Sequence, residues 1–218
     1  MRPLYGVLQQ GAAEMGLALT SHQLGQLLDY LALLQKWGKV YNLTAVRNPD
    51  EMLTHHLLDS LAVVQPLRRQ LAKSPDSARA RLLDVGSGAG LPGVVIAVCC
   101  PDLDVSCVDR VAKKAAFIQQ VVLSLGLTHL RGVHARVEDL SGQYEVVVSR
   151  AFASLGDFTA LSWGALAPGG LWMAMKGKQP DDELATLPAQ VQVFHVEPVA
   201  VPGLDAQRCL IWMRPSGV

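Results

Sequence analysis

A glycine-rich stretch, LLDVGSGAGLPG at residues 82–93, is the part of the sequence most suited to holding a ligand. Its first four residues have the pattern of a short buried strand, and the residues after Pro92 can begin a helix. Glycines between a strand and a helix let the backbone turn tightly and approach a ligand, and the free N–H groups of a helix start attract anions. The loop is therefore a candidate binding site at the carboxyl end of a strand.

Three ligands are compared for this loop: a nucleoside triphosphate, a dinucleotide and S-adenosylmethionine. The triphosphate is disfavoured because no Lys-Ser or Lys-Thr pair follows the glycines. The dinucleotide stays open by pattern, since Gly88, Gly90 and Gly93 fit GxGxxG and Asp109 lies about 20 residues further on. Charge distinguishes the dinucleotide from S-adenosylmethionine. The repulsion between a carboxylate such as Asp84 and the pyrophosphate of a dinucleotide would cost roughly 1–4 kcal/mol at intermediate dielectric.

S-adenosylmethionine carries a sulfonium and an ammonium group against one carboxylate, so an acidic neighbour favours it. We therefore predict that S-adenosylmethionine binds here, with Asp84, Gly88 and Gly90 at the loop. Asp109 ends the segment expected to form the second strand, and its two oxygens suit ribose hydroxyls. A glycine turn without any ligand is the remaining alternative.

From residue 81 onward, apolar segments of strand length alternate with helical patterns. This order is typical of a doubly wound α/β domain, a mostly parallel sheet with helices on both faces. The last two apolar segments are joined by a short loop, so we expect a closing antiparallel pair of strands. The expected strands are RLLDV, DVSCVD, LRGVHA, YEVVVSR, GLWMAMKG, VQVFHVEPVAV and QRCLIWMRP.

The residues before this domain have helical patterns. Thr20 and Gln23 resemble a capping box, and Asn48 has the features of an N-cap before a helix that reaches about residue 64. We therefore predict a helical N-terminal lobe at 1–75 and a Rossmann-like domain at 76–218.

Composition narrows the classes of function. Basic and acidic residues number 19 each, so bulk charge does not drive the protein onto nucleic acid and local patches must do so. We expect no membrane segment, because no apolar run has the length of a membrane span. We expect no metal site, because none of the four cysteines forms a CxxC pair and buried reduced thiols are the simpler interpretation.

Seven motifs together resemble those of one family, the bacterial small-subunit (16S) ribosomal RNA guanine-N7 methyltransferases, also called RsmG or glucose-inhibited division protein B. The motifs occur in the order and spacing of that family across nearly the whole chain. They are YNLT (41–44), HHLLDSL (55–61), LLDVGSGAGLPG (82–93), DRVAKKAAF (109–117), RVE (136–138), SRAFA (149–153) and MKGK (175–178).

The resemblance implies a class I methyltransferase fold and a cytoplasmic enzyme that transfers a methyl group from S-adenosylmethionine to N7 of one guanosine. Carried over by position, the cofactor contacts fall on Gly86, Leu91, Val137, Glu138 and Arg150. The expected partner is small-subunit ribosomal RNA, presented as a ribonucleoprotein, and we expect the enzyme to be a monomer.

Guanine N7 has a lone pair and no proton, so its methylation needs no general base. We therefore expect no catalytic acid or base, and rate enhancement from placing N7 in line with the methyl group. Arg150 suits either the carboxylate of the donor or guanine O6 or a phosphate of the RNA, and position alone leaves both open.

Four further residues are candidates for contacts to RNA: Asn42, His56, Lys176 and Lys178. His56 belongs to a helix that the resemblance makes a cover over the cleft, and the two lysines follow the fifth expected strand on the ligand side of the sheet. A small-molecule methyltransferase and an RNA-binding protein with a vestigial cofactor site are the alternative functions.

Overall fold

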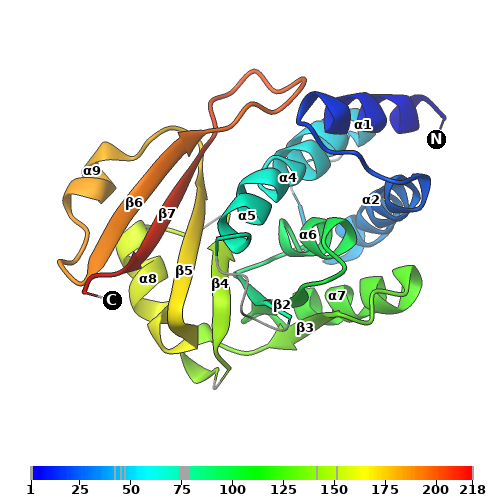
Figure 1. The fold of residues 1–218 in the computed structure, drawn as a ribbon. Helices are drawn as coiled ribbons and strands as arrows, with labels where there is room; N and C mark the ends of the chain where they lie inside the picture. Colours follow the sequence, from blue (N-terminus) through cyan, green and yellow to red (C-terminus); the bar gives the residue numbers. More distant parts are fainter. Residues whose placement is uncertain are drawn as a thin grey trace.

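The computed structural model describes residues 2–41, 43, 44, 46, 48–73, 79–140, 142–150 and 152–217. Seven strands form one sheet with helices on both faces (Figure 1). The strands are β1 (Arg81–Val85), β2 (Asp104–Asp109), β3 (Leu130–His134), β4 (Tyr144–Ser149), β5 (Leu166–Lys176), β6 (Val191–Pro198) and β7 (Cys209–Pro215).

The strand order is β3-β2-β1-β4-β5-β7-β6, and β7 runs antiparallel to both of its neighbours. The expected mostly parallel sheet with an antiparallel last strand is thus confirmed. The order reverses between β1 and β4, and ligands of open α/β sheets bind in the crevice at such a point. This places the carboxyl ends of β1 and β4 at the candidate site.

Helices connect the strands and precede them. Before the sheet come α1 (Arg2–Glu14), α2 (Ser21–Tyr41), α3 (Pro49–Met52), the π-helix η1 (Leu53–Leu58), α4 (Asp59–Leu61) and α5 (Val64–Leu71). The later helices are α6 (Gly93–Cys99), α7 (Ala112–Leu125), α8 (Leu155–Ser162), α9 (Asp181–Ala185) and the short 3₁₀ turns η2 (Val137–Asp139) and η3 (Trp163–Ala165).

Both predicted helix caps are confirmed. Thr20 and Gln23 form the reciprocal capping box, with backbone-to-side-chain distances of 3.0 and 3.2 Å. Asn48 caps α3 by accepting the Asp50 N–H at 2.9 Å. The helix expected to end near residue 64 instead turns at residues 62 and 63 and continues as α5.

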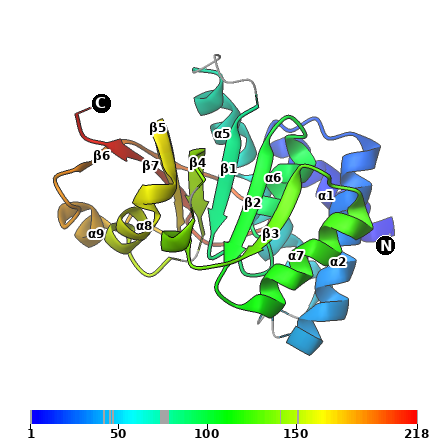
Figure 2. The same cartoon turned by 90° about the horizontal axis from the view of Figure 1, so that it is seen from below.

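The N-terminal helices pack on the same face of the sheet as α6 and α7, whereas α8 and α9 lie on the opposite side (Figure 2). Residues from α1, α2, η1, α5, α6 and α7 share one hydrophobic cluster with that face of the sheet. Side-chain amides of α2 reinforce the contact, since Gln23 donates to the Val98 carbonyl at 3.0 Å and Gln26 to the Leu125 carbonyl at 2.9 Å.

The predicted boundary between the two domains, at residues 75 and 76, falls within residues 74–78, which lie outside the described residues, and it stays a prediction. Within the described residues, no helix is both long and apolar enough to cross a membrane.

Candidate cofactor and substrate site

The glycine loop between β1 and α6 has a backbone that requires glycine. Gly86, Gly88 and Gly90 have φ angles of 65°, 59° and 94°, in the left-handed region that other residues rarely adopt. A Cβ on Gly86 would meet nothing within 4 Å, whereas one on Gly90 would lie 2.5 Å from side chains of Val94 and Ile118. The loop is therefore packed on one side and open on the other, as a ligand cradle must be.

Asp84 lies beneath this loop and is fully buried. Its Oδ2 accepts the Gly93 N–H at 2.8 Å, and its Oδ1 has no hydrogen-bond partner among the described atoms. Burial raises the pKa of Asp84 to about 7. A buried unpartnered carboxylate oxygen costs free energy unless something binds it, which fits a site for a cationic ligand. Burial therefore favours the neutral form of Asp84 in the free protein, whereas the sequence alone predicts an ordinary carboxylate.

Asp109, at the end of β2, holds the other side of the loop. Its Oδ2 accepts the Gly88 N–H at 3.0 Å and its Oδ1 accepts the Val111 N–H at 2.9 Å, with Lys114 Nζ 3.6 Å away. Each carboxylate oxygen has a second lone pair, so these bonds leave capacity for ribose hydroxyls. Asp109 therefore shapes the cradle as well as facing it.

The remaining cofactor candidates are Leu91 in the loop itself, Val137 and Glu138 in η2, and Arg150 directly after β4. Leu91 is buried at the end of the loop, and Val137 is buried in η2 after β3. Glu138 is exposed and pairs with Arg136 Nη2 at 2.7 Å, and this hydrogen bond lowers the pKa of Glu138. Their contacts to a cofactor stay predictions.

Sequence reasoning missed a contact from α2 to the loop. The Tyr30 hydroxyl is fully buried and donates to the Ala89 carbonyl at 2.7 Å. Tyr30 belongs to the apolar stripe of α2, between Leu27 and Leu31, and a stripe of this kind indicates residues of the hydrophobic core. The available signal was the hydroxyl itself, because a buried tyrosine usually finds a hydrogen-bond partner.

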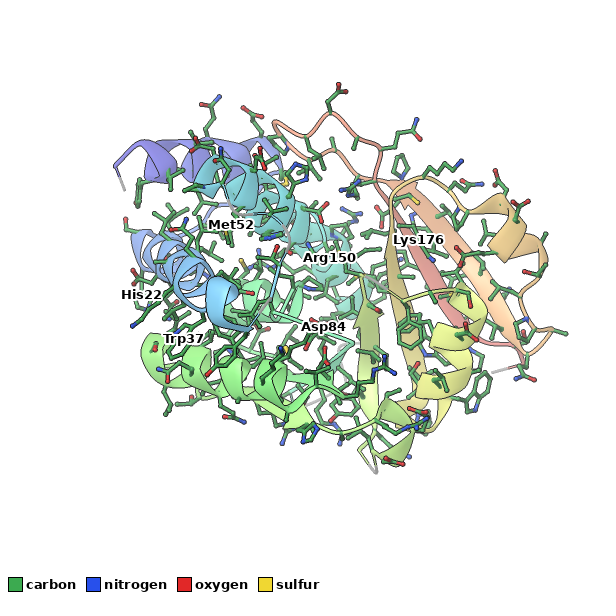
Figure 3. The ribbon with its side chains drawn as sticks, turned by 180° about the vertical axis from the view of Figure 1, so that it is seen from behind. His22, Trp37, Met52, Asp84, Arg150 and Lys176 are labelled. Atoms are coloured by element: carbon green, nitrogen blue, oxygen red, sulfur yellow. The ribbon has the colours of Figure 1, made fainter. Side chains whose placement is uncertain are left out.

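A cleft of about 390 Å³ opens at the carboxyl ends of β4 and β5, covered by the π-helix η1. Arg150, Asp84 and Lys176 lie at adjoining strand ends near the middle of the molecule (Figure 3), and the charge of Arg150 lowers the pKa of Asp84, although less than burial raises it. The cleft therefore adjoins the cradle. Its polar lining residues are His55, His56, Asp59, Arg150, Lys176 and Arg208.

Asp59 of α4 organises two arginines in this cleft. Its Oδ1 accepts Arg208 Nε at 2.7 Å, and its Oδ2 lies 3.4 Å from Arg150 Nη1, which also donates to the His55 carbonyl at 3.1 Å. Asp59 is only 3% exposed, so the carboxylate is held between the guanidinium groups and away from solvent. Arg150 is one of the site residues expected from the sequence, whereas Asp59 and Arg208 are not among them.

His56 is buried in η1, with Nε2 2.7 Å from Thr44 Oγ1, and burial lowers its pKa. It therefore does not pair with Asp59, although the two residues are three apart in the sequence. Lys176 reaches the cleft, but both oxygens of Glu183 lie 2.9 Å from its Nζ. Lys178 is exposed beyond β5, and Asn42 lies outside the described residues.

The comparisons with known proteins agree with this geometry. The family model GidB, described as rRNA small subunit methyltransferase G, matches residues 23–211. The chain belongs to this family. Ribosomal RNA small subunit methyltransferase G of Albidiferax ferrireducens is 65% identical over 224 residues, covering 100% of both chains. The protein of the same name from Acidovorax sp. is 67% identical over 212 residues, covering 95% of this chain and 94% of the other.

Solved structures confirm the class I methyltransferase fold of this family member. The 1,6-didemethyltoxoflavin-N1-methyltransferase of Burkholderia thailandensis, solved with S-adenosylhomocysteine, has a TM-score of 0.57 and 16% identity, covering 86% of this chain and 89% of that one. TrmN of Thermus thermophilus has a TM-score of 0.54 and 17% identity, covering 75% of this chain and 53% of that one. At these identities the likeness concerns the fold alone.

Proposed function

We propose that this chain transfers a methyl group from S-adenosylmethionine to N7 of a guanosine in small-subunit ribosomal RNA, in the bacterial cytoplasm. The observation that supports it most is the family match over residues 23–211, which spans both the cradle and the cleft. The motifs recognised in the sequence belong to that same family.

The described residues fit the methyl donor. Asp84 Oδ1 is a buried oxygen without a partner, next to a glycine loop that is open above Gly86. Asp84, Gly86, Gly88, Gly90 and Leu91 would hold the amino-acid part of the donor. The ribose and adenine would be held by Asp109, Val137 and Glu138. When bound, S-adenosylmethionine supplies an electrophilic methyl group on a positively charged sulfur.

The chain's own residues position the base and need not remove a proton, because guanine N7 reacts through a lone pair. Two guanidinium groups share one carboxylate in the cleft, which leaves excess positive charge there. The methylated guanine is itself cationic, so this charge favours release of the modified base over rebinding.

The form of the substrate follows from the charge of the whole protein. Net charge is zero, and long-range attraction for free RNA is therefore weak. We propose that a monomer recognises the guanosine within a preassembled small subunit. Equal turnover on a short naked oligonucleotide would contradict this part of the proposal.

Label transfer tests the proposal. The purified chain is incubated with tritiated S-adenosylmethionine and with small subunits from a bacterium that lacks the enzyme, naked small-subunit RNA, or a mixture of small metabolites. We expect label in one 7-methylguanosine of the subunit RNA. Label in a metabolite would favour a small-molecule methyltransferase, and donor binding absent by calorimetry would indicate a vestigial site.

A further inference from the structure

Among its described lining residues, the cleft beside the cradle has two guanidinium groups and one carboxylate, Asp59, so its guanidinium donors outnumber its carboxylate acceptors. Both oxygens of Asp59 face guanidinium groups, at 2.7 Å for Arg208 and 3.4 Å for Arg150. The His55 carbonyl accepts from Arg150 at 3.1 Å, and the Gln207 carbonyl accepts from Arg208 at 2.9 Å. Each guanidinium has five N–H donors, so donors remain after these bonds are made.

The excess of hydrogen-bond donors distinguishes guanine from adenine as the base that could enter the cleft. Guanine presents an acceptor at O6 next to N7, whereas adenine presents an amino donor at the same place. The opposite edge of guanine carries the N1–H and 2-amino donors, which need acceptors. A surface rich in donors therefore suits O6, whereas the 2-amino group lies on the edge of the base that faces away from N7 and O6.

We propose that this cleft selects guanine over adenine by donating to O6, with Arg208 as the reading residue, and that the 2-amino group is not read. Arg208 is chosen because its Nε is engaged by Asp59 and its Nη1 by a carbonyl, which leaves Nη2 without a partner among the described residues. This inference rests on the proposed function, since it names how that same site recognises its base.

Asp59 acts through the arginines as a positioning residue. Arg208 lies in the loop before β7 and Arg150 directly after β4, so neither strand alone fixes how close the two guanidinium groups lie. A buried carboxylate between them holds both in place and reduces their mutual repulsion. The reading group is thereby assembled from segments 149 residues apart in the sequence.

Base analogues test the inference. Small subunits are reconstituted with RNA in which the methylated guanosine, first mapped by mass spectrometry, is replaced by inosine or 2-aminopurine. Inosine keeps O6 and lacks the 2-amino group, and 2-aminopurine has the reverse pattern. We expect kcat/KM on inosine within about threefold of guanosine, and a loss of about 10- to 100-fold on 2-aminopurine, the range for one hydrogen bond to a charged group. Dimethyl sulfate, which methylates N7 without protein, corrects for the intrinsic reactivity of each base.

A variant then links the loss to Arg208. Arg208→Met is expected to lower kcat/KM on guanosine subunits by about 10- to 100-fold and on 2-aminopurine subunits by less than about twofold, because the bond to O6 is already absent there. Arg214→Met is the matched control, since Arg214 lies on β7 and donates to Gln192 on β6. Affinity for S-adenosylhomocysteine, measured by calorimetry, verifies that each variant is folded.

The outcomes separate the inference from the function on which it rests. No methylation of unsubstituted guanosine would contradict the proposed function. Methylation of guanosine with equal turnover of 2-aminopurine would overturn the inference alone, as would an equal effect of Arg208→Met on both subunits. The latter result would indicate that Arg208 binds an RNA phosphate instead.

Discussion

The cradle and the cleft lie side by side, but they are built in different ways. The cradle consists of backbone groups and two carboxylates from nearby segments, residues 84–93 and Asp109, held by bonds such as Gly93 N–H to Asp84. The cleft consists of histidine side chains from η1 and charged side chains from α4, from the residue after β4, from β5 and from the loop before β7. The residues of the cradle are mostly neighbours in the sequence, whereas the residues of the cleft come together only after folding.

The largest effect should come from crowding the cradle. Gly93→Ala places a Cβ in contact with Cys107 Sγ and 2.8 Å from Asp84 Oδ2, where nothing can move without disturbing β1 and β2. We expect a loss of about 1–3 kcal/mol of unfolding free energy, a fall in Tm of roughly 3–10 °C, and donor affinity reduced by more than about 100-fold. Calorimetry and thermal unfolding measure both.

Gly6→Ala is the matched control, because a Cβ on that helical residue of α1 meets nothing within 4 Å. An unchanged Tm in Gly93→Ala would show that the cradle is not packed as described.

In the cleft, Asp59→Asn keeps the shape of the side chain and removes its charge. The guanidinium groups of Arg150 and Arg208 then repel each other without a shared anion. We expect kcat/KM for subunits to fall by about 10- to 100-fold, while the Kd for S-adenosylhomocysteine changes by less than about threefold. If donor affinity fell as far as turnover, the division between cradle and cleft would be wrong.

Asp84→Asn tests the cradle through the pH dependence of stability. Burial raises the pKa of Asp84 to about 7 from 3.8, so the folded protein binds a proton that the unfolded chain releases. The free wild-type protein should therefore lose stability as the pH rises from about 4 to about 7. Chemical denaturation across this range should show stability falling more steeply with pH in the wild type than in Asp84→Asn, and equal slopes would contradict a buried acid.

The same substitution should weaken donor binding by about 10- to 100-fold at pH 8, because the unpartnered Oδ1 is the oxygen that a cationic group would meet. The affinity of the wild-type protein for S-adenosylmethionine should also increase as the pH rises through about 7. Above that pH Asp84 is already ionised in the free protein, so no proton has to be released on binding.

The smallest expected effect comes from Tyr30→Phe, which removes the bond from α2 to the Ala89 carbonyl of the loop. Leaving a buried carbonyl without a donor costs about 1–3 kcal/mol, and part of this should appear as a roughly threefold to tenfold weaker donor affinity. Tyr5→Phe, the same change on α1, is the control. Unchanged donor affinity in Tyr30→Phe would mean that α2 supports the fold and not the cradle.

The difference between the two regions also explains what the sequence could predict. The alternation of strands and helices, the caps at Thr20 and Asn48, and the loop with Asp84 follow from local patterns, and the structure confirms them. Short-range rules suffice there because hydrogen-bonding periodicity and glycine geometry act over a few residues.

Three residues that line the cleft, His56, Arg150 and Lys176, are expected at the site from the sequence, but the pairing of Asp59 with two arginines could not be predicted in the same way. Asp59 and Arg208 are 149 residues apart, and no periodicity relates them. Asp59 lies only three residues from His56, yet folding directs His56 to Thr44 and Asp59 to the arginines. The burial that raises the pKa of Asp84 is likewise a property of the packed sheet and not of the loop sequence.

The most direct test of the account is mass spectrometry of small-subunit RNA from cells with this gene, without it, and with it restored. We expect one 7-methylguanosine to be lost when the gene is deleted and to return with the wild-type chain but not with Asp59→Asn at low expression. An unchanged set of methylated nucleosides in the deletion strain would contradict it.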